Sequence, residues 1–466
     1  MDRRLAVVLA VTLGASAAWA QAPADSLTLS DPAFLKVPEG LGEIVVAKAP
    51  PTVYAHVFKD LPNGGKGTLW SGWGNGCIAS NGKYYTAMGD HLDLAGGNGQ
   101  SRIYEFDPAT KALQMVVNMR DIIPDTTLAG GKVHARLQEA ADGWLYFTTY
   151  WGKVPRATDW DAGFQGSALL RYDPRAGKAE CLGVPVPQQG LPTSLMDAKR
   201  GLIYFYAVYS GDLVVYDLTK REVRYRGSGD IQTGGRNIIA DLDGNVYFGT
   251  KDGHLARYSP DSGKVTITAA VLPSRGGAAA SEEGEDEGGP KAAKGGKGAK
   301  SGKTSEEGGS KRGDVLRAST RPARDGTVYA MTSPGMLFAF APKRETIKDL
   351  GPNFLQGDYT AIVLLSPDEK YLYYAPGSHG SAQRHGAALV QYEIATGKRK
   401  VLAFLAPLLR EKLAYVLGGT FNMEITADGA TLIGTFNGAP YDPAARKTVA
   451  FGQPSLLVIQ IPPSER

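Results

Sequence analysis

A turn signal and a run of alternating apolar and polar residues recur together along the chain. Alternation with a period of two predicts a half-buried β-strand, and an Asp-Gly or Asn-Gly pair before it predicts a tight hairpin. In each occurrence an aromatic or aliphatic residue follows the turn residue by four positions. The pairs are Asn81 with Tyr85, Asp142 with Tyr146, Arg200 with Tyr204, Asp243 with Tyr247, Asp325 with Tyr329, Glu369 with Tyr373 (without a glycine) and Asp428 with Leu432.

A second strand follows most of these signals and ends in an acidic or polar turn, as in YEFDPATK, LRYDPRAGK and VVYDLTK. Each unit therefore holds about four strands in roughly 40 residues, the period of a β-propeller blade. Seven units predict an all-β fold, a seven-bladed β-propeller of four-stranded antiparallel blades. We expect residues 21–60, which contain EIVVAK and TVYAHVF, to supply a strand that closes the ring, because closure leaves no long unpaired edge.

One long insertion interrupts the repeats. We expect blades one to four over residues 61–273 and blades five to seven over residues 315–466. Residues 274–314 contain no aromatic residue and no aliphatic side chain larger than alanine, so they cannot bury enough surface to offset their ordering entropy. This composition predicts a disordered loop, and an interaction tail is the alternative.

The first 20 residues have the features of an export signal. Arg3 and Arg4 precede the apolar run LAVVLAVTLGASA, and Ala18-Trp19-Ala20 has the small-x-small pattern of a cleavage site. We expect cleavage near Ala20 and a periplasmic or secreted protein. No later segment approaches the run of about 18 apolar residues that crosses a bilayer, so no membrane span is expected.

Composition changes this picture little. The 59 glycines, 28 prolines and 22 tyrosines suit many short strands joined by tight turns. The net charge of +4 gives no support for nucleic-acid binding, which needs a clustered basic face. We expect a monomer. Cys77 and Cys181 fall on different strands of neighbouring units, which favours two thiols over a disulfide.

A polar column recurs six positions before the turn residue of each unit. A strand buried on both faces is expected to be apolar throughout, because an unpaired polar group in the core costs about 1–3 kcal/mol. We therefore place the column on the innermost strands, facing a central channel, where either ordered water or a ligand meets it. Its members are Asn75, Arg136, Ser194, Asn237, Ser319, Val363 and Asn422.

His134 lies two positions upstream of Arg136 in this alignment, so both are expected at the rim of the channel. A cation beside an imidazole is costly unless an anion binds there, which predicts a site for a small anionic ligand such as an acidic carbohydrate. Imidazole is also the side chain best suited to accept a proton near neutral pH. The expected substrate-binding residues of this site are Trp73, Asn75, Asn237, Arg317 and Asn422.

Loops inserted between strands carry further candidates, since loops on a rigid scaffold often hold sites. The aromatic-rich loop at Tyr150 and Trp151 either stacks on sugar rings or forms a small core of its own. The catalytic candidates are His91 in MGDHLDLAGGNGQ, His379, Arg384 and His385 in GSHGSAQRHG, and Tyr359 in QGDYTA.

The blade pattern resembles that of the six- and seven-bladed propellers that include streptogramin lyase, the gluconolactonase/regucalcin family and oligogalacturonate lyase. Stretches such as GDHLDLAGGNG, GGKVHARLQEAADGWLYF and PGSHG also look like those of exported bacterial propeller proteins. The likeness to oligogalacturonate lyase implies histidines and an arginine at the channel mouth. The likeness to regucalcin-type lactonases implies a divalent cation in or near the channel, with Asn75, Asn237 and Glu424 as its ligands.

Three hypotheses of function follow. The first is an exported enzyme that cleaves an acidic carbohydrate by β-elimination, which needs a cation for the carboxylate, a base and an acid. The second is a non-catalytic propeller module that binds a protein or a glycan. The third is a metal-dependent lactone or ester hydrolase. In the first, Arg136 or Arg384 is the cation, His134 is the base, and His91, His379 or Tyr359 is the acid.

Overall fold

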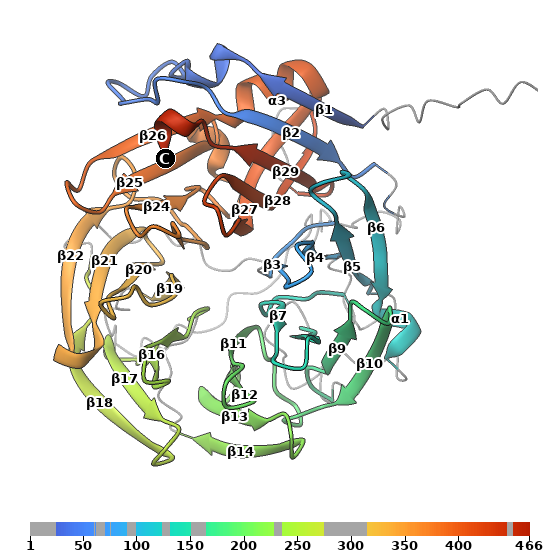
Figure 1. Ribbon diagram of the computed structural model, residues 1–466, viewed down its shortest axis with the longest axis vertical. Coiled ribbons are helices and arrows are strands. Elements are labelled where there is room, and N and C mark those ends of the chain that lie inside the picture. Colours follow the sequence, from blue (N-terminus) through green and yellow to red (C-terminus); the bar gives the residue numbers. More distant parts are fainter. Residues whose placement is uncertain are drawn as a thin grey trace, which may run out of the picture.

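Seven antiparallel sheets surround a central axis (Figure 1), which confirms the predicted seven-bladed β-propeller. The predicted export signal lies outside the described residues, as does the predicted insertion from residue 275 onward. The computed structural model describes residues 25–59, 61, 70–74, 76–90, 99–123, 131–150, 165–227, 235–274, 315–444 and 451–466.

Six of the seven sheets are built from four consecutive strands each, and the first strand of each is innermost. Blade one contains β3 (Cys77–Ile78), β4 (Tyr84–Gly89), β5 (Ser101–Phe106) and β6 (Leu113–Asn118). Blade two contains β7 (Gln138–Glu139), β8 (Leu145–Thr148), β9 (Leu169–Asp173) and β10 (Lys178–Gly183). Blade three contains β11 (Thr193–Asp197), β12 (Leu202–Ala207), β13 (Asp212–Asp217) and β14 (Glu222–Gly227). Blade four contains β15 (Ile239–Ala240), β16 (Val246–Gly249), β17 (His254–Ser259) and β18 (Lys264–Val271). Blade five contains β19 (Leu316–Ser319), β20 (Val328–Thr332), β21 (Met336–Ala341) and β22 (Thr346–Pro352). Blade six contains β23 (Leu364–Leu365), β24 (Tyr371–Tyr374), β25 (Ala388–Glu393) and β26 (Arg399–Phe404).

Blade seven joins the two ends of the described chain. Its inner strands are β27 (Tyr415–Ile425), β28 (Thr431–Pro440) and β29 (Ser455–Gln460), and its outer strands are β2 (Thr52–Val57) and β1 (Ser26–Ser30). Figure 1 shows the blue N-terminal strands beside the dark red C-terminal ones. The predicted ring closure by TVYAHVF is therefore confirmed. EIVVAK forms no strand and makes a single parallel bridge, between Val46 and Val401.

Hydrophobic side chains fill the spaces between adjacent blades. Between blades three and four, for example, Tyr204 and Val215 pack with Phe248 and Tyr258, and all four are almost completely buried. Such a core accounts for the near-continuous apolar runs of the second and third strands, because both faces of each sheet are covered.

Short helices are confined to the connections: α1 (Met119–Ile122), α3 (Leu405–Leu413), and the 3-10 turns η1 (Pro32–Leu35), η3 (Pro342–Arg344), η4 (Ala382–His385) and η5 (Pro463–Glu465). In the part of the chain that the structure describes, no helix is both long and apolar enough to cross a membrane.

The connections differ sharply between the two ends of the ring. Because consecutive strands are antiparallel, the turns after the first and third strands of each blade lie at one end, which we call the turn end. The connections after the second strands and between blades lie at the other end, which we call the loop end. Apart from residues 31–51 between β1 and β2, the connections of more than ten residues leave from the loop end, including residues 272–315 between β18 and β19. A site built from the long connections within and between blades one to six is therefore at the loop end.

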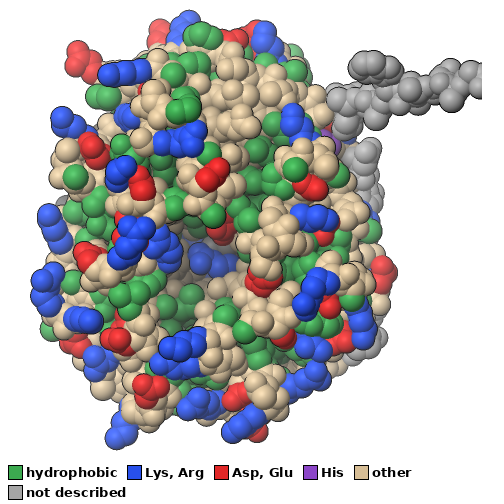
Figure 2. All heavy atoms as spheres, in the orientation of Figure 1, with side chains coloured by type: hydrophobic (Ala, Val, Ile, Leu, Met, Phe, Trp, Pro, Cys, Tyr) green, Lys and Arg blue, Asp and Glu red, His purple; other side chains and the backbone are tan. Residues whose placement is uncertain are grey.

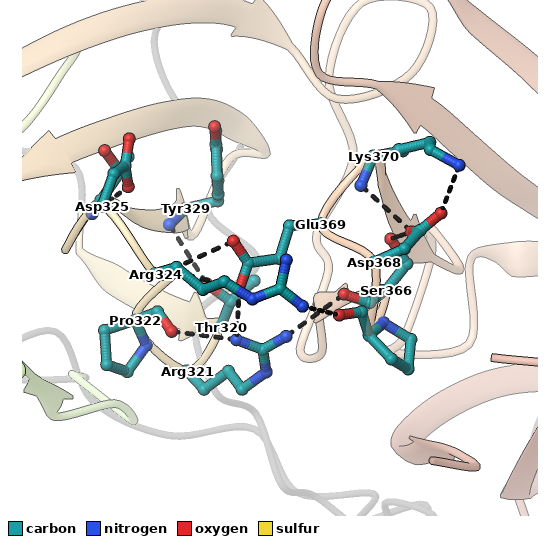
Figure 3. A network of polar contacts seen from close by, with 12 residues as sticks. Thr320, Arg321, Pro322, Arg324, Asp325, Tyr329, Ser366, Asp368, Glu369 and Lys370 are labelled. Carbon is teal, nitrogen blue, oxygen red and sulfur yellow. Dashed lines mark hydrogen bonds and ion pairs between the residues drawn. The ribbon is translucent and has the colours of Figure 1, made fainter. Parts of the chain in front are cut away.

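The turn end is tied together by contacts between neighbouring blades. Glycines at the predicted turns have positive φ, such as +79° at Gly82, and Glu369 occupies the same position in blade six at +64°. A side chain in this conformation costs about 1–2 kcal/mol. Figure 3 shows what offsets this cost: the Glu369 carboxylate pairs with Arg321 at 3.0 Å and accepts from the backbone N–H of Arg324 at 3.1 Å, which links blade six to blade five.

Candidate functional site

A cavity lies on the axis of the ring and is lined from all seven blades. Its empty volume is about 430 Å³, which includes open solvent at its mouth. Figure 2 shows the hollow at the centre of the ring, with Lys and Arg side chains inside it. The lining residues are Trp73, His134, Arg136, Pro192, Thr193, Ser194, Leu195, Arg236, Asn237, Ile238, Arg317, Ala361 and Phe421.

The charge of this lining is entirely positive among the described residues. Arg136, Arg236 and Arg317 come from blades two, four and five, and no Asp or Glu is present among the described residues that line the cavity. Arg317 is 5% exposed, and its guanidinium lies 4.9 Å from the ring centre of Tyr359. Three guanidinium groups around one small space create a positive potential that favours an anion.

His134 also lines the cavity, and hydrogen bonding defines its neutral form. Its Nδ1 lies 2.8 Å from the carbonyl oxygen of Pro192, which can only accept, so Nδ1 donates and Nε2 keeps its lone pair. Burial lowers the pKa of His134, and the charges of Lys132, Arg236 and Arg317 lower it further. The ring is therefore neutral at pH 7 and offers a basic nitrogen beside the arginines.

An aromatic cluster surrounds Trp73 at the loop end of the cavity. The indole stacks on Phe451 at 5.4 Å and contacts Phe421 at 4.8 Å and His379 at 5.3 Å. The Nζ of Lys132 lies 4.0 Å from the Trp73 ring, and that lysine is 1% exposed. Trp73 is itself only 9% exposed, so it supports the cavity wall and presents little ring surface to a ligand.

Two more predicted residues belong to this cluster. The Tyr359 ring lies 6.1 Å from His379, and Tyr150 lies 5.6 Å from His134. Tyr150 is 2% exposed and packs above Lys132, which favours the small core over sugar stacking for this residue. The structure thus brings together His134, Arg136, Trp73, Arg317, Tyr359, His379 and Tyr150.

Other predicted residues lie elsewhere. His385 is in η4, where its Nε2 lies 2.8 Å from the carboxylate of Asp358, and Arg384 is exposed. Neither residue lines the cavity. Asn75, His91 and Trp151 lie outside the described residues, so their predicted roles stay predictions.

The polar column mainly bonds neighbouring blades to one another. The Ser194 hydroxyl donates to the Arg136 carbonyl at 3.2 Å, and the Ser319 hydroxyl donates to Asn237 at 2.6 Å. We expected these polar positions to meet water or a ligand, but adjacent innermost strands satisfy part of their hydrogen-bonding capacity. Asn237 and Ser194 nevertheless line the cavity as expected.

The position of Asn422 corrects one prediction, because we expected this side chain to face the cavity and bind substrate. Its side chain is fully buried between blades seven and one and does not face the cavity. It accepts from the Gly76 N–H at 2.7 Å and from the Tyr84 hydroxyl, and it donates to Thr86 at 2.7 Å. Asn422 therefore holds the closure of the ring together.

Glu424 lies near the turn end of β27. Burial raises its pKa to about 7, and the charge of Arg136 partly opposes that rise. By exposed area the residue is half-buried, which fits a carboxyl group that meets water only inside a narrow channel. Near neutral pH it is therefore partly protonated.

The metal hypothesis is disfavoured by the charge of the site. No group of three or more His, Cys, Asp or Glu side chains with metal-binding geometry occurs in the described ranges. Asn237, one of the expected ligands, lines the same cavity as the three arginines, and their positive charge opposes a cation there. Of the expected donors that the structure describes, Asn237 lies beside these arginines and Glu424 does not line the cavity, so this part of the donor set does not fit a divalent ion there.

Sequence reasoning missed Lys132, Arg236, Phe421 and Phe451. Lys132 lies two positions before His134 and belongs to the same alternation as His134 and Arg136, so that spacing could have identified it. Arg236 lies just before β15, where the chain is not yet a regular strand. Phe421 reaches the cavity because a bulge between Thr420 and Asn422 shifts the register of β27.

The fold and the cavity together define a seven-bladed β-propeller with a cationic central site. No protein-family model and no curated protein sequence matches the chain. The WD40 repeats of RRP9 superpose with a TM-score of 0.50 at 8% identity, covering 90% of this chain and 100% of that one. The structure of U3-55K gives a TM-score of 0.49 at 7% identity, covering 87% and 98%. At 8% identity the similarity to the RRP9 repeats shows the propeller fold alone.

Proposed function

We propose that the protein binds a small anionic ligand of the acidic-carbohydrate class in its central cavity. The observation that supports this most strongly is the lining by Arg136, Arg236 and Arg317 without a described acidic residue. Guanidinium groups bind carboxylates through paired N–H donors, which fits the carboxylate of a uronate. Ser194 and Asn237 offer polar partners for sugar hydroxyl groups.

The neutral His134 supports a β-elimination on the bound uronate. Its Nε2 lone pair takes the proton from C5, the electron pair forms the C4=C5 double bond, and the C4–O bond breaks. The leaving oxygen takes a proton from an acid, for which Tyr359 and His379 are the described candidates near the cavity. The arginines lower the cost of the negative charge that develops beside the carboxylate.

The test incubates the purified protein with uronate polymers and oligomers and follows both binding and the absorbance of unsaturated uronate. We expect product formation, and we expect His134→Gln to abolish it while changing the binding affinity by less than about threefold. Binding without product in the wild type refutes the elimination and leaves a non-catalytic carbohydrate-binding module. Failure of every acidic sugar to bind refutes the proposed function as a whole.

A further inference from the structure

The cavity is enclosed sideways by the ring. Residues that precede or form the innermost strands of all seven blades line it, from Trp73 in blade one to Phe421 in blade seven. The spaces between the blades are filled with buried hydrophobic side chains, as between blades two and three and between blades three and four. A ligand can therefore approach the arginines only along the axis of the ring.

The space on this axis opens along the axis alone, so a chain that continues in both directions would have to pass through the ring or fold back inside it. Its volume of about 430 Å³ already includes open solvent at the mouth. Among the described residues near the mouth, Trp73 offers no platform along which a chain could lie, because its ring is engaged by Phe451 and by Lys132. An interior sugar residue has a neighbour on each side, and both would have to fit inside the walls.

We infer that the site takes a free uronate or the terminal residue of an acidic chain, and not an interior residue. The terminal residue enters along the axis with its carboxylate toward Arg136, Arg236 and Arg317, while the rest of the chain stays outside the cavity. This inference rests on the proposed function and adds to it the part of the substrate that is recognised.

The test measures dissociation constants by calorimetry for galacturonate and glucuronate, for their trimers and hexamers, and for the long polymers. With concentrations expressed per chain, recognition of an end predicts constants that agree within about threefold from trimer to polymer. Recognition of interior residues predicts instead that the dissociation constant per chain falls in proportion to chain length, because a longer chain offers more binding sites. The second result overturns the inference but leaves the proposed function intact, whereas absence of binding at every length refutes both.

Two variants link the binding to the cavity. Arg317→Gln and Arg136→Gln are each expected to weaken binding of the monomer and of the polymer by the same factor, about tenfold or more. Arg175→Gln is the matched control, since Arg175 is 72% exposed on the outer part of blade two, and it should leave the affinity unchanged. A variant that weakens only polymer binding contradicts recognition of an end. The thermal midpoint of each variant shows that the fold is retained.

Discussion

Replacement of Glu424 by Gln tests the environment of the channel directly. Burial raises the pKa of this carboxyl from 4.5 to about 7 in the folded chain. Between these two pH values the folded chain binds a proton that the unfolded chain has lost. Stability is therefore lost as the pH rises through this window, and Gln, which cannot ionise, removes the loss.

The magnitude follows from the two pKa values. They differ by about 2.5 units, and at about 1.36 kcal/mol per unit the ionised carboxylate costs at most about 3 kcal/mol above pH 8. Because the carboxyl meets some water in the channel, we expect Glu424→Gln to stabilise the fold by about 1–3 kcal/mol at pH 8. At pH 4 both chains carry a neutral group, so their stabilities should agree within about 0.5 kcal/mol.

The assay is urea denaturation of both chains, followed by circular dichroism from pH 4 to pH 8.5. Glu222→Gln is the control, because the Glu222 side chain is 61% exposed and its loss should give no such pH dependence. If the free energies of unfolding of the wild type and Glu424→Gln differed by the same amount at pH 4 and at pH 8, the reasoning would be refuted. A variant less stable than the wild type at pH 8 would refute it as well.

Three further substitutions test the ring closure by chemical denaturation. Asn422→Ala removes three buried hydrogen bonds and should destabilise the fold by about 3–5 kcal/mol, whereas a loss below about 1 kcal/mol contradicts the described network. Glu465→Gln weakens the buried pair with Lys400 and should cost about 2–4 kcal/mol, more than the exposed control Glu411→Gln. Gly76→Ala places a Cβ 2.3 Å from the Tyr85 carbonyl oxygen and should cost at least about 2 kcal/mol, while a neutral effect means the strand is free to shift.

The sequence predicts the blades well because each one repeats a local signal. A tight turn before an alternating strand needs a residue that tolerates positive φ, and Gly82 has φ +79° as the pattern requires. In blade six the glycine is absent, and the positive φ falls on Glu369, one residue before the position that the spacing predicts. The closing strand could also be predicted, because TVYAHVF had no other partner among the repeats.

The site is less predictable because the innermost strands are short. In blade four β15 covers only Ile239–Ala240, so Arg236 and Asn237 precede it, and alternation no longer decides which side chain faces the cavity. In blade seven the bulge turns Phe421 toward the cavity and Asn422 into the junction with blade one. His134 and Arg136 were predicted because both remain in step with the repeat in blade two.

The composite blade also has a consequence for biosynthesis. β2 pairs with β29, so an edge made among the first 57 residues waits for a partner that ends at residue 460. While the chain is being synthesised, that apolar edge has no native neighbour and is open to pairing with other nascent chains. The last step of maturation is then the docking of the two distant ends, and its rate sets how long the nascent protein needs protection from aggregation.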